Sequence, residues 1–426
     1  MSHIEDHPLR YKLANELHAR PFPAMAAPCT AAFIAIKKAE SAALRDRSND
    51  MAHLLNLLDR HGAAHPQPGA THYYGEIGKS WIKWEQHTEF ATYTIFSEGV
   101  DERPFDPVSF STFPDDWLAD APGQRVTSAL LRIEQTADRA HVATCLKDWF
   151  VPESLAVSSV LDDAAVVAGD FRIDPAGHQR FAVFAKPETG ARRVGRIVQR
   201  LCEIETYKAM SMLGFAHAQN MGGTLNALDG QLTDLMGNMS SEQAAAETTL
   251  HDLLTIASEL ENLSARGSFR FGATGAYAAI VNQRIEALRE ERFEGRQSFA
   301  EFMMRRYEPA MRTVKSAELR LDAMSSRSIR AGNLLRTRVD VERSAQNQAL
   351  LTSMDRRADQ QLHLQRTVEG LSVVAISYYA VSLVGYLIYP LADMTGLSKG
   401  MMTALITLPV VGLVWAILRR VQRQKN

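Results

Sequence analysis

Residues 15–23, written NELHARPFP, place a carboxylate, an imidazole and a guanidinium within a few positions, as a catalytic site would. On a helix, at about 100° per residue, Glu16 and Arg20 fall beside a stripe of leucines, whereas His18 faces elsewhere. Glu four residues before Arg is the favourable order for an ion pair. We therefore expect Glu16 and Arg20 to form a structural ion pair at the edge of a buried face. The alternative is that Arg20 or His18 faces a ligand.

The other patterns that could do chemistry are weaker. The run RFGATG, residues 270–275, could offer backbone N–H groups to an anion, but flexible glycines at the start of a helix explain it as well. His61 and His65 lie in a loop with proline and glycine, so no helical face makes them a metal pair. Trp81 and Trp84 fit the alternation of a half-buried strand without a nucleic acid.

The sequence contains no Walker loop and no HExxH, GxSxG or EF-hand motif. We therefore expect no catalytic residue, no cofactor and no metal, and hence a non-enzymatic protein. An enzyme that uses Glu16, His18 or Arg20 is the least supported hypothesis.

The composition excludes some broad classes. The chain has 426 residues, of which 46% are hydrophobic, so a disordered protein is not expected. Its formal charge of −2 does not suggest a partner such as nucleic acid. Cys29, Cys145 and Cys202 lie far apart, form no CxxC pair and are interpreted as packing thiols in a reducing compartment.

The C-terminal end predicts a transmembrane hairpin. Residues 370–392 contain no charged side chain and, as a helix, are about long enough to cross a hydrocarbon layer of roughly 30 Å. Residues 401–418 form a second, shorter apolar run after a short loop, 393–400. Tyr386, Tyr389 and Trp415 would lie at the membrane interfaces, and a basic tail, 419–426, follows. A buried helical hairpin in a soluble core is the alternative.

Basic residues predict the orientation of this hairpin. Arg356, Arg357 and Arg366 precede the first span and four basic residues follow the second, whereas the loop carries only Lys399 against Asp393. The start of the chain lacks the pattern of a secretory signal. Both termini are therefore expected in the cytoplasm.

The part before the hairpin divides by composition near Pro187. Residues 1–187 predict an α+β domain with an antiparallel or mixed sheet, 188–309 a helical domain, and 310–369 a long stalk helix with a narrow apolar seam. We expect helices at 7–20 and 40–60, and a hairpin turn at 174–177. The expected strands are 30–36, 71–77, 81–84, 90–96, 129–133, 155–161, 164–173 and 179–185.

Long helices are expected after Pro187. Helical spacing covers 194–235, where Gly222 and Gly223 could interrupt it. A capping box at 240–243 then opens a helix over 244–266 that Gly267 ends. Further helices cover about 276–293 and 297–307. The absence of proline between 309 and 390 allows one helix from Met311 through the first span, or two that meet near Gly332.

Several blocks resemble a bacterial family of unknown function that is described as membrane-anchored. They are NELHARPFP, the run 269–295, FMMRRYEPAMRT at 302–313, LLRTRVDVE at 334–342 and the span 367–387. The resemblance covers almost the whole chain. It implies an inner-membrane location but carries no activity, cofactor or catalytic residue.

The architecture is also similar, more distantly, to CorA-type magnesium transporters, which are pentameric channels. Those proteins carry Gly-Met-Asn at the end of the first span, where this chain has Tyr389-Pro390-Leu391. Selection of a hydrated cation by the same route is therefore doubtful. Within the first span, small residues could pack against other helices or line a pore, with packing favoured. These residues are Ser372, Ser377, Ser382 and Gly385.

The favoured hypothesis is a non-enzymatic scaffold or interaction protein at the inner membrane of a bacterium. It would be in contact with the lipid bilayer, would self-associate through its stalk and spans into a homo-oligomer, and would dock a cytosolic protein partner. The alternative is a CorA-like oligomeric ion channel or transporter.

Overall fold

The structure is a computed structural model that describes residues 4–16, 22–39, 46–238, 246–395 and 398–425. The chain forms two compact units, one of residues 1–242 with 251–331 and one of residues 243–250 with 332–426. The domain boundaries expected at 187, 309 and 369 stay predictions.

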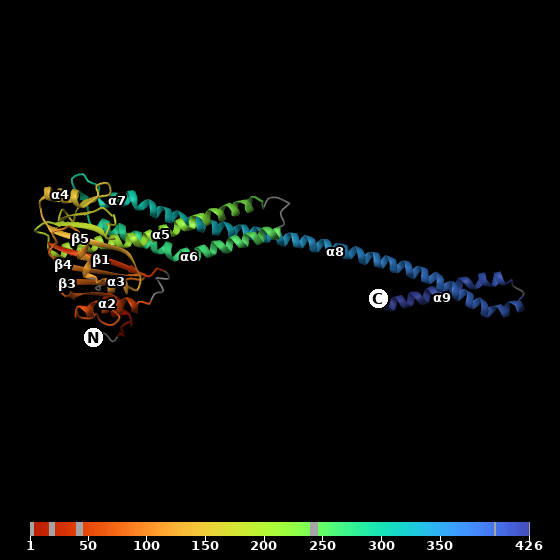
Figure 1. The fold of residues 1–426 in the computed structure, drawn as a ribbon. Helices are drawn as coiled ribbons and strands as arrows, with labels where there is room; N and C mark the ends of the chain where they lie inside the picture. Colours follow the sequence, from red (N-terminus) through yellow and green to blue (C-terminus); the bar gives the residue numbers. More distant parts are fainter. Residues whose placement is uncertain (1–3, 17–21, 40–45, 239–245, 396–397, 426) are drawn as a thin grey trace. The chain divides into compact units, whose positions relative to one another are not determined.

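The described part of the first unit contains a nine-stranded mixed sheet in the order β2-β3-β4-β1-β5-β8-β7-β6-β9 (Figure 1). All neighbouring strands are antiparallel except β5 and β8, which run parallel. This sheet confirms the predicted α+β class. The strands are β1 (Cys29–Lys37), β2 (His72–Ile77), β3 (Ser80–Gln86), β4 (Phe90–Glu98), β5 (Gln124–Gln135), β6 (Ala156–Val160), β7 (Ala165–Gly169), β8 (Gln179–Ala185) and β9 (Glu291–Arg292).

The eight strands expected from the sequence all form, and only β9 was not anticipated. β7 ends at Gly169, four residues before the expected end, and pairs with β8 in antiparallel register. The turn between them lies where it was predicted, because the Gly177 N–H donates to the Asp174 carbonyl at 2.9 Å. Gly177 adopts a φ of +92°, which a residue with a side chain rarely takes.

The central strands bury both faces, since successive side chains point to opposite sides. Phe33 and Leu131 pack on the side of α5 (Ala191–Asn238), whereas Ile34 and Leu130 pack on the side of α2 (Ser48–Arg60). A third cluster lies under α4 (Arg139–Trp149). The short helices are α1 (Arg10–Glu16), η2 (Pro107–Thr112), α3 (Asp115–Ala119) and α7 (Phe299–Arg306).

The helices after the sheet are longer than expected. α5 runs unbroken through Gly222 and Gly223, and α6 (Ala246–Ala287) runs through Gly267. The predicted helix end at Gly267 is therefore wrong, and the expected capping box at 240–243 lies outside the described residues. A Cβ on Gly267 would lie 3.0 Å from the Phe271 ring, so the absent side chain leaves room for that ring.

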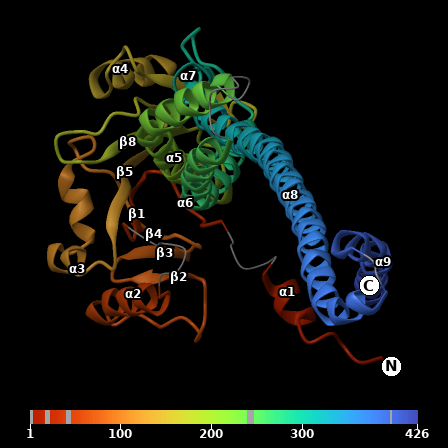
Figure 2. The same ribbon diagram turned by 90° about the vertical axis from the view of Figure 1, so that its right-hand side faces the viewer.

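α5 and α6 lie side by side against the sheet (Figures 1 and 2). A Cβ on Gly214 of α5 would lie 2.0 Å from Thr274 Oγ1 and 2.9 Å from Thr274 Cβ. The two helix backbones can therefore approach this closely only because residue 214 has no side chain.

Two buried carboxylates fasten these helices to the sheet. Glu205 of α5 has no exposed surface and accepts hydrogen bonds from Thr127 of β5 at 2.8 Å and Gln179 of β8 at 2.6 Å. Glu89, in the turn between β3 and β4, is equally buried and accepts from Arg270 and Tyr277 of α6. Because a buried charge is costly unless it is paired, each contact fixes one helix to a defined strand.

α8 (Glu308–Thr395) is one helix that begins in the first unit and continues through Gly332 into the second, where α9 (Lys399–Lys425) follows it. Both helices contain stretches long and apolar enough to cross a membrane. Only 11% of the most apolar stretch of α8 and 6% of that of α9 is buried. The protein itself therefore leaves these apolar side chains largely uncovered.

The contact between α5 and α6 predicts opposite effects for two glycine substitutions in one helix. Gly214→Ala should lower the free energy of unfolding by roughly 1–2 kcal/mol, because overpacking against Thr274 outweighs the gain in helix propensity. Gly222→Ala, with nothing within 4 Å of its Cβ, should raise that free energy by up to about 1 kcal/mol. Denaturant unfolding of the detergent-solubilised chain, followed by circular dichroism, measures both. Equal effects would contradict the close packing at Gly214.

Candidate functional site

The NELHARPFP block cannot be placed as a site. Glu16 is the last residue of α1, its side chain lies outside the described residues, and so do His18 and Arg20. The Glu16–Arg20 ion pair therefore stays a prediction. The expectation that the leucine stripe beside it forms a buried face is wrong in the described part of α1, because Leu13 is 61% exposed.

The other residues that the sequence suggested for a site have structural roles in the fold. RFGATG lies inside α6 rather than at its start, so its N–H groups are within a continuous helix and the expected helix start there is wrong. His65 Nε2 lies 2.7 Å from Asp59 Oδ1, and His61 follows the end of α2. Trp84 is fully buried and Trp81 stacks on Tyr74 with ring centroids 5.2 Å apart.

In the second unit a groove of about 540 Å³ lies between α8 and α9. Ser377, Ser382 and Gly385 of α8 line it opposite Thr403 and Thr407 of α9. The Ser382 hydroxyl donates to the Tyr378 carbonyl at 2.9 Å. The buried Ser377 hydroxyl has no hydrogen-bond partner among the described residues.

Ser372 differs from the other three small residues predicted for this face. It is exposed, does not line the groove, and its hydroxyl donates to the Val368 carbonyl at 2.8 Å. Three of the four predicted residues therefore share one groove.

A polar cavity of about 240 Å³ lies in the first unit, between the sheet and the two long helices. One wall is the α5-facing side of β1, β3 and β4, and the other is formed by α5 and α6. Its apolar lining includes Phe33, Phe96 and Val198. Charged side chains from three separate elements also enter it, which is unusual for space between a sheet and its covering helices.

The charges in this cavity form two pairs. Lys83 and Glu85 lie two residues apart on β3, so they share a face, and Lys83 Nζ lies 3.2 Å from Glu85 Oε2. Glu203 of α5 accepts hydrogen bonds from Arg284 of α6 and from Gln199, the latter at 2.7 Å. Lys83 is 6% exposed, and its Nζ makes no hydrogen bond within the described chain.

Arg200 is the remaining cation of the cavity. Its Nη1 donates to the Ala287 carbonyl at 2.8 Å, and no carboxylate in the described residues lies within 4.0 Å of its guanidinium nitrogens. Burial, followed by repulsion from Arg196 and Arg284, lowers the pKa of Arg200. The cavity thus contains three cations and two carboxylates, a formal excess of one positive charge.

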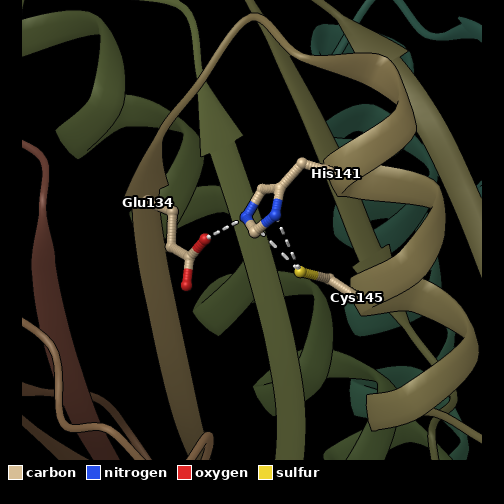
Figure 3. A group of neighbouring side chains, drawn as sticks. All are labelled: Glu134, His141 and Cys145. Carbon is tan, nitrogen blue, oxygen red and sulfur yellow. Dashed lines mark hydrogen bonds and ion pairs between the residues drawn. The ribbon is translucent and has the colours of Figure 1, made fainter.

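A second group, Glu134, His141 and Cys145, joins the end of β5 to the first turns of α4 (Figure 3). Asp138 caps α4 by accepting from the Ala140 N–H at 2.9 Å, and the spacing of four then places His141 and Cys145 on one helix face. His141 Nε2 lies 3.1 Å from Glu134 Oε2 and 3.5 Å from Cys145 Sγ.

This arrangement does not form an activated cysteine. In a nucleophile–base–acid relay the two partners of histidine use different ring nitrogens, whereas here Glu134 and Cys145 both lie nearest to Nε2. Burial, and then the negative charge of Glu134, raises the pKa of the Cys145 thiol to about 11. At neutral pH the sulfur is therefore a protonated thiol and a poor nucleophile.

The same three side chains are the ones that could hold a metal, because their ligand atoms all lie within 4.8 Å of one another. For Zn²⁺ bonds of about 2.0–2.3 Å, the edges of a tetrahedron are about 3.3–3.7 Å, close to the observed separations. However, Arg132 donates to the other oxygen of Glu134 at 2.7 Å and brings a positive charge beside the group. The Glu134 carboxylate therefore has a structural role, because it bridges Arg132 and His141.

Sequence patterns did not reveal the polar cavity or the Glu134 group. The cavity residues Lys83, Arg200 and Arg284 are far apart in the chain and meet only because α5 and α6 cover β3. For the cavity, the local sequence signal was that the oppositely charged Lys83 and Glu85 lie on the same face of a strand that also contains a buried tryptophan. For the second group, the signal was histidine and cysteine four residues apart on a capped helix.

Together, the fold and these sites define a protein with an α+β domain, two long helices packed on its sheet, and two C-terminal helices of membrane-span character. A family model described as "Protein of unknown function (DUF3422)" matches residues 5–425. The chain belongs to this family, which confirms the resemblance to a family of unknown function. Comparisons with curated proteins and with solved structures found no match.

The raised pKa of Cys145 predicts its reactivity. Because the neutral thiol is favoured, alkylation of Cys145 by iodoacetamide should be slow at pH 7 and should rise about tenfold per pH unit without a plateau up to pH 9.5. Peptide mass mapping of the labelled chain measures the rate at this residue. His141→Ala should leave the rate at pH 7 unchanged or faster. A plateau below pH 8, or a slower rate in His141→Ala, would contradict this account and indicate an activated cysteine.

Proposed function

We propose that this chain is a non-enzymatic interaction protein, anchored in the inner membrane of a bacterium by the end of α8 and by α9. Its two termini lie in the cytoplasm, and copies of the chain associate through these helices. The α+β domain is then tethered on the cytoplasmic side of the membrane, where it docks a cytosolic protein partner.

The uncovered apolar surface of the second unit supports the anchor. Leu383 and Leu387 of α8 are 64% and 75% exposed, and Leu405 and Leu408 of α9 are 78% and 80% exposed. Burial of each such side chain in hydrocarbon is worth roughly 1.5–3 kcal/mol. The Arg419 guanidinium lies 4.8 Å from the centre of the Trp415 ring, a pairing suited to a membrane interface.

The distribution of basic residues supports the orientation. Arg356, Arg357 and Arg366 precede the apolar stretch of α8, and Arg419 and Arg420 end that of α9. Between the two stretches the sequence has only one basic residue, Lys399. This asymmetry is typical of a hairpin whose ends both face the cytoplasm.

The observation that carries self-association is the groove between α8 and α9. Lipid tails cannot satisfy a hydroxyl, and the Ser377 hydroxyl is without a hydrogen-bond partner in the described residues. A helix of a second copy can fill a groove lined by serine, threonine and glycine, since small residues allow close approach.

The stalk segment of α8 also supports association. Leu351 and Leu362 are 63% and 52% exposed and, eleven residues apart, lie on the same face of the helix. On a helix otherwise rich in charged residues, such a seam is typical of pairing with another helix. We infer a second copy of α8 as that partner.

The groove provides a test of this proposal. Native mass spectrometry of the full chain, released from detergent micelles, should find more than one copy in each particle. Ser377→Leu should shift the distribution toward single chains, because leucine fills the groove and blocks helix approach. The matched variant Ser372→Leu, at an exposed serine outside the groove, should keep the wild-type distribution.

Three results would contradict the proposal. A monomeric wild-type chain would exclude self-association. Equal effects of the two serine variants would show that association does not use the groove. An ion flux across proteoliposome membranes that Ser377→Leu abolishes would show that the chain forms an oligomeric channel of CorA-like architecture rather than a scaffold.

A further inference from the structure

The geometry points to the cavity between the sheet and α5–α6 as a binding site for a small organic anion, with its carboxylate beside Arg200 and Lys83 and its apolar part against Phe33, Phe96 and Val198. This binding function is separate from the membrane anchor and from self-association.

The charge of the cavity determines the sign of the ligand. Lys83 is paired with Glu85, and Arg284 with Glu203, so each pair is close to neutral. Arg200 remains, and its described partner is a neutral carbonyl. Arg200 is partly buried and forms no ion pair with a carboxylate in the described residues, so one negative charge from a ligand would stabilise it. Arg200 has further N–H groups with which to hold a carboxylate.

Unsatisfied polar atoms support a ligand rather than a purely structural network. Gln199 Oε1 is buried and makes no hydrogen bond in the described residues, and Lys83 Nζ, although it is 3.2 Å from Glu85 Oε2, makes no hydrogen bond of good geometry there either; both residues line the cavity. Buried polar atoms are nearly always satisfied in folded proteins, so two such atoms at one cavity indicate missing partners. A ligand that carries both a carboxylate and a hydroxyl or amine could satisfy both.

The size and lining of the cavity restrict the ligand further. About 240 Å³ is below the range of roughly 300–1,000 Å³ that is usual for drug-sized ligands, so a nucleotide is too large. Phe33 and Phe96 come from neighbouring strands of the sheet, and Val198 faces them from α5. This apolar wall favours an organic acid over an inorganic anion, which would gain nothing from it.

The location of the site links binding to the long helices. Arg200 and Glu203 belong to α5, and Arg284 belongs to α6, while Lys83 and Glu85 belong to β3. A ligand held by all three elements stabilises the contact between the helices and the sheet by mass action. Binding is therefore expected to raise the thermal stability of the first unit.

Isothermal titration calorimetry tests the site on the full chain in detergent at pH 7. The probes are benzoate, lactate and inorganic phosphate. At least one of the two carboxylates should bind at one site per chain and raise the unfolding temperature. Arg200→Gln should weaken that binding by about tenfold or more, since a charged hydrogen bond is lost.

Two further variants complete the experiment. Arg192→Gln removes an exposed arginine of the same helix that does not line the cavity, and it should bind like the wild type. Thr94→Met places a larger side chain into the cavity from β4, and it should abolish binding with little change in the unfolding temperature of the ligand-free chain. It also tests the site independently of whether Arg200→Gln folds.

Three outcomes would overturn the inference. The first is that neither carboxylate binds to the wild-type chain. The second is that Arg192→Gln weakens binding as much as Arg200→Gln does, or that folded Thr94→Met binds normally. The third is that only phosphate binds, which would exclude the organic acid and the role of the apolar wall.

Discussion

Two carboxylates with no exposed surface, Glu89 and Glu205, hold the long helices on the sheet of the first unit. Glu205 accepts from β5 and β8 side chains and lies 2.6 Å from Lys208 Nζ of its own helix, while Glu89 accepts from two α6 side chains. If its hydrogen-bond partners moved away, each carboxylate would be a buried, unpaired charge, which is strongly unfavourable. These contacts therefore fix α5 over β5 and β8 and α6 beside the turn between β3 and β4, and with them the walls of the polar cavity.

Close packing contributes the second constraint at the same interface. Gly214 allows α5 to approach Thr274 of α6, and a Cβ on Gly195 would lie 1.7 Å from the Pro23 carbonyl oxygen, so the chain before β1 also packs directly on α5. The space that remains is lined by charges because β3 directs Lys83 and Glu85 to this face. A site made by both a sheet and two helices responds to any change in their packing, which suits a domain that binds a ligand.

The sequence predicted the strands well and the helix ends less well. Short β-rich runs located β1 and β4, whose two faces are both buried, and the proline-free stretch after residue 309 correctly allowed the unbroken α8. Glycine is common at helix ends, so the sequence predicts a helix end at Gly267. In the structure Gly267 lies inside α6, where its missing side chain leaves room for the Phe271 ring. The polar cavity was missed because its charged residues are distant in sequence and are brought together only by tertiary packing.

The central claim is that the second unit crosses the membrane and that the first unit stays in the cytoplasm. Labelling of single introduced cysteines in bacterial spheroplasts with a membrane-impermeant maleimide tests it directly, because the native thiols are buried. Ser398→Cys, in the connection between α8 and α9, should react in intact spheroplasts. Ser48→Cys, at the exposed start of α2, should react only after lysis. Reaction of Ser48→Cys without lysis, or protection of Ser398→Cys until lysis, would contradict the claim.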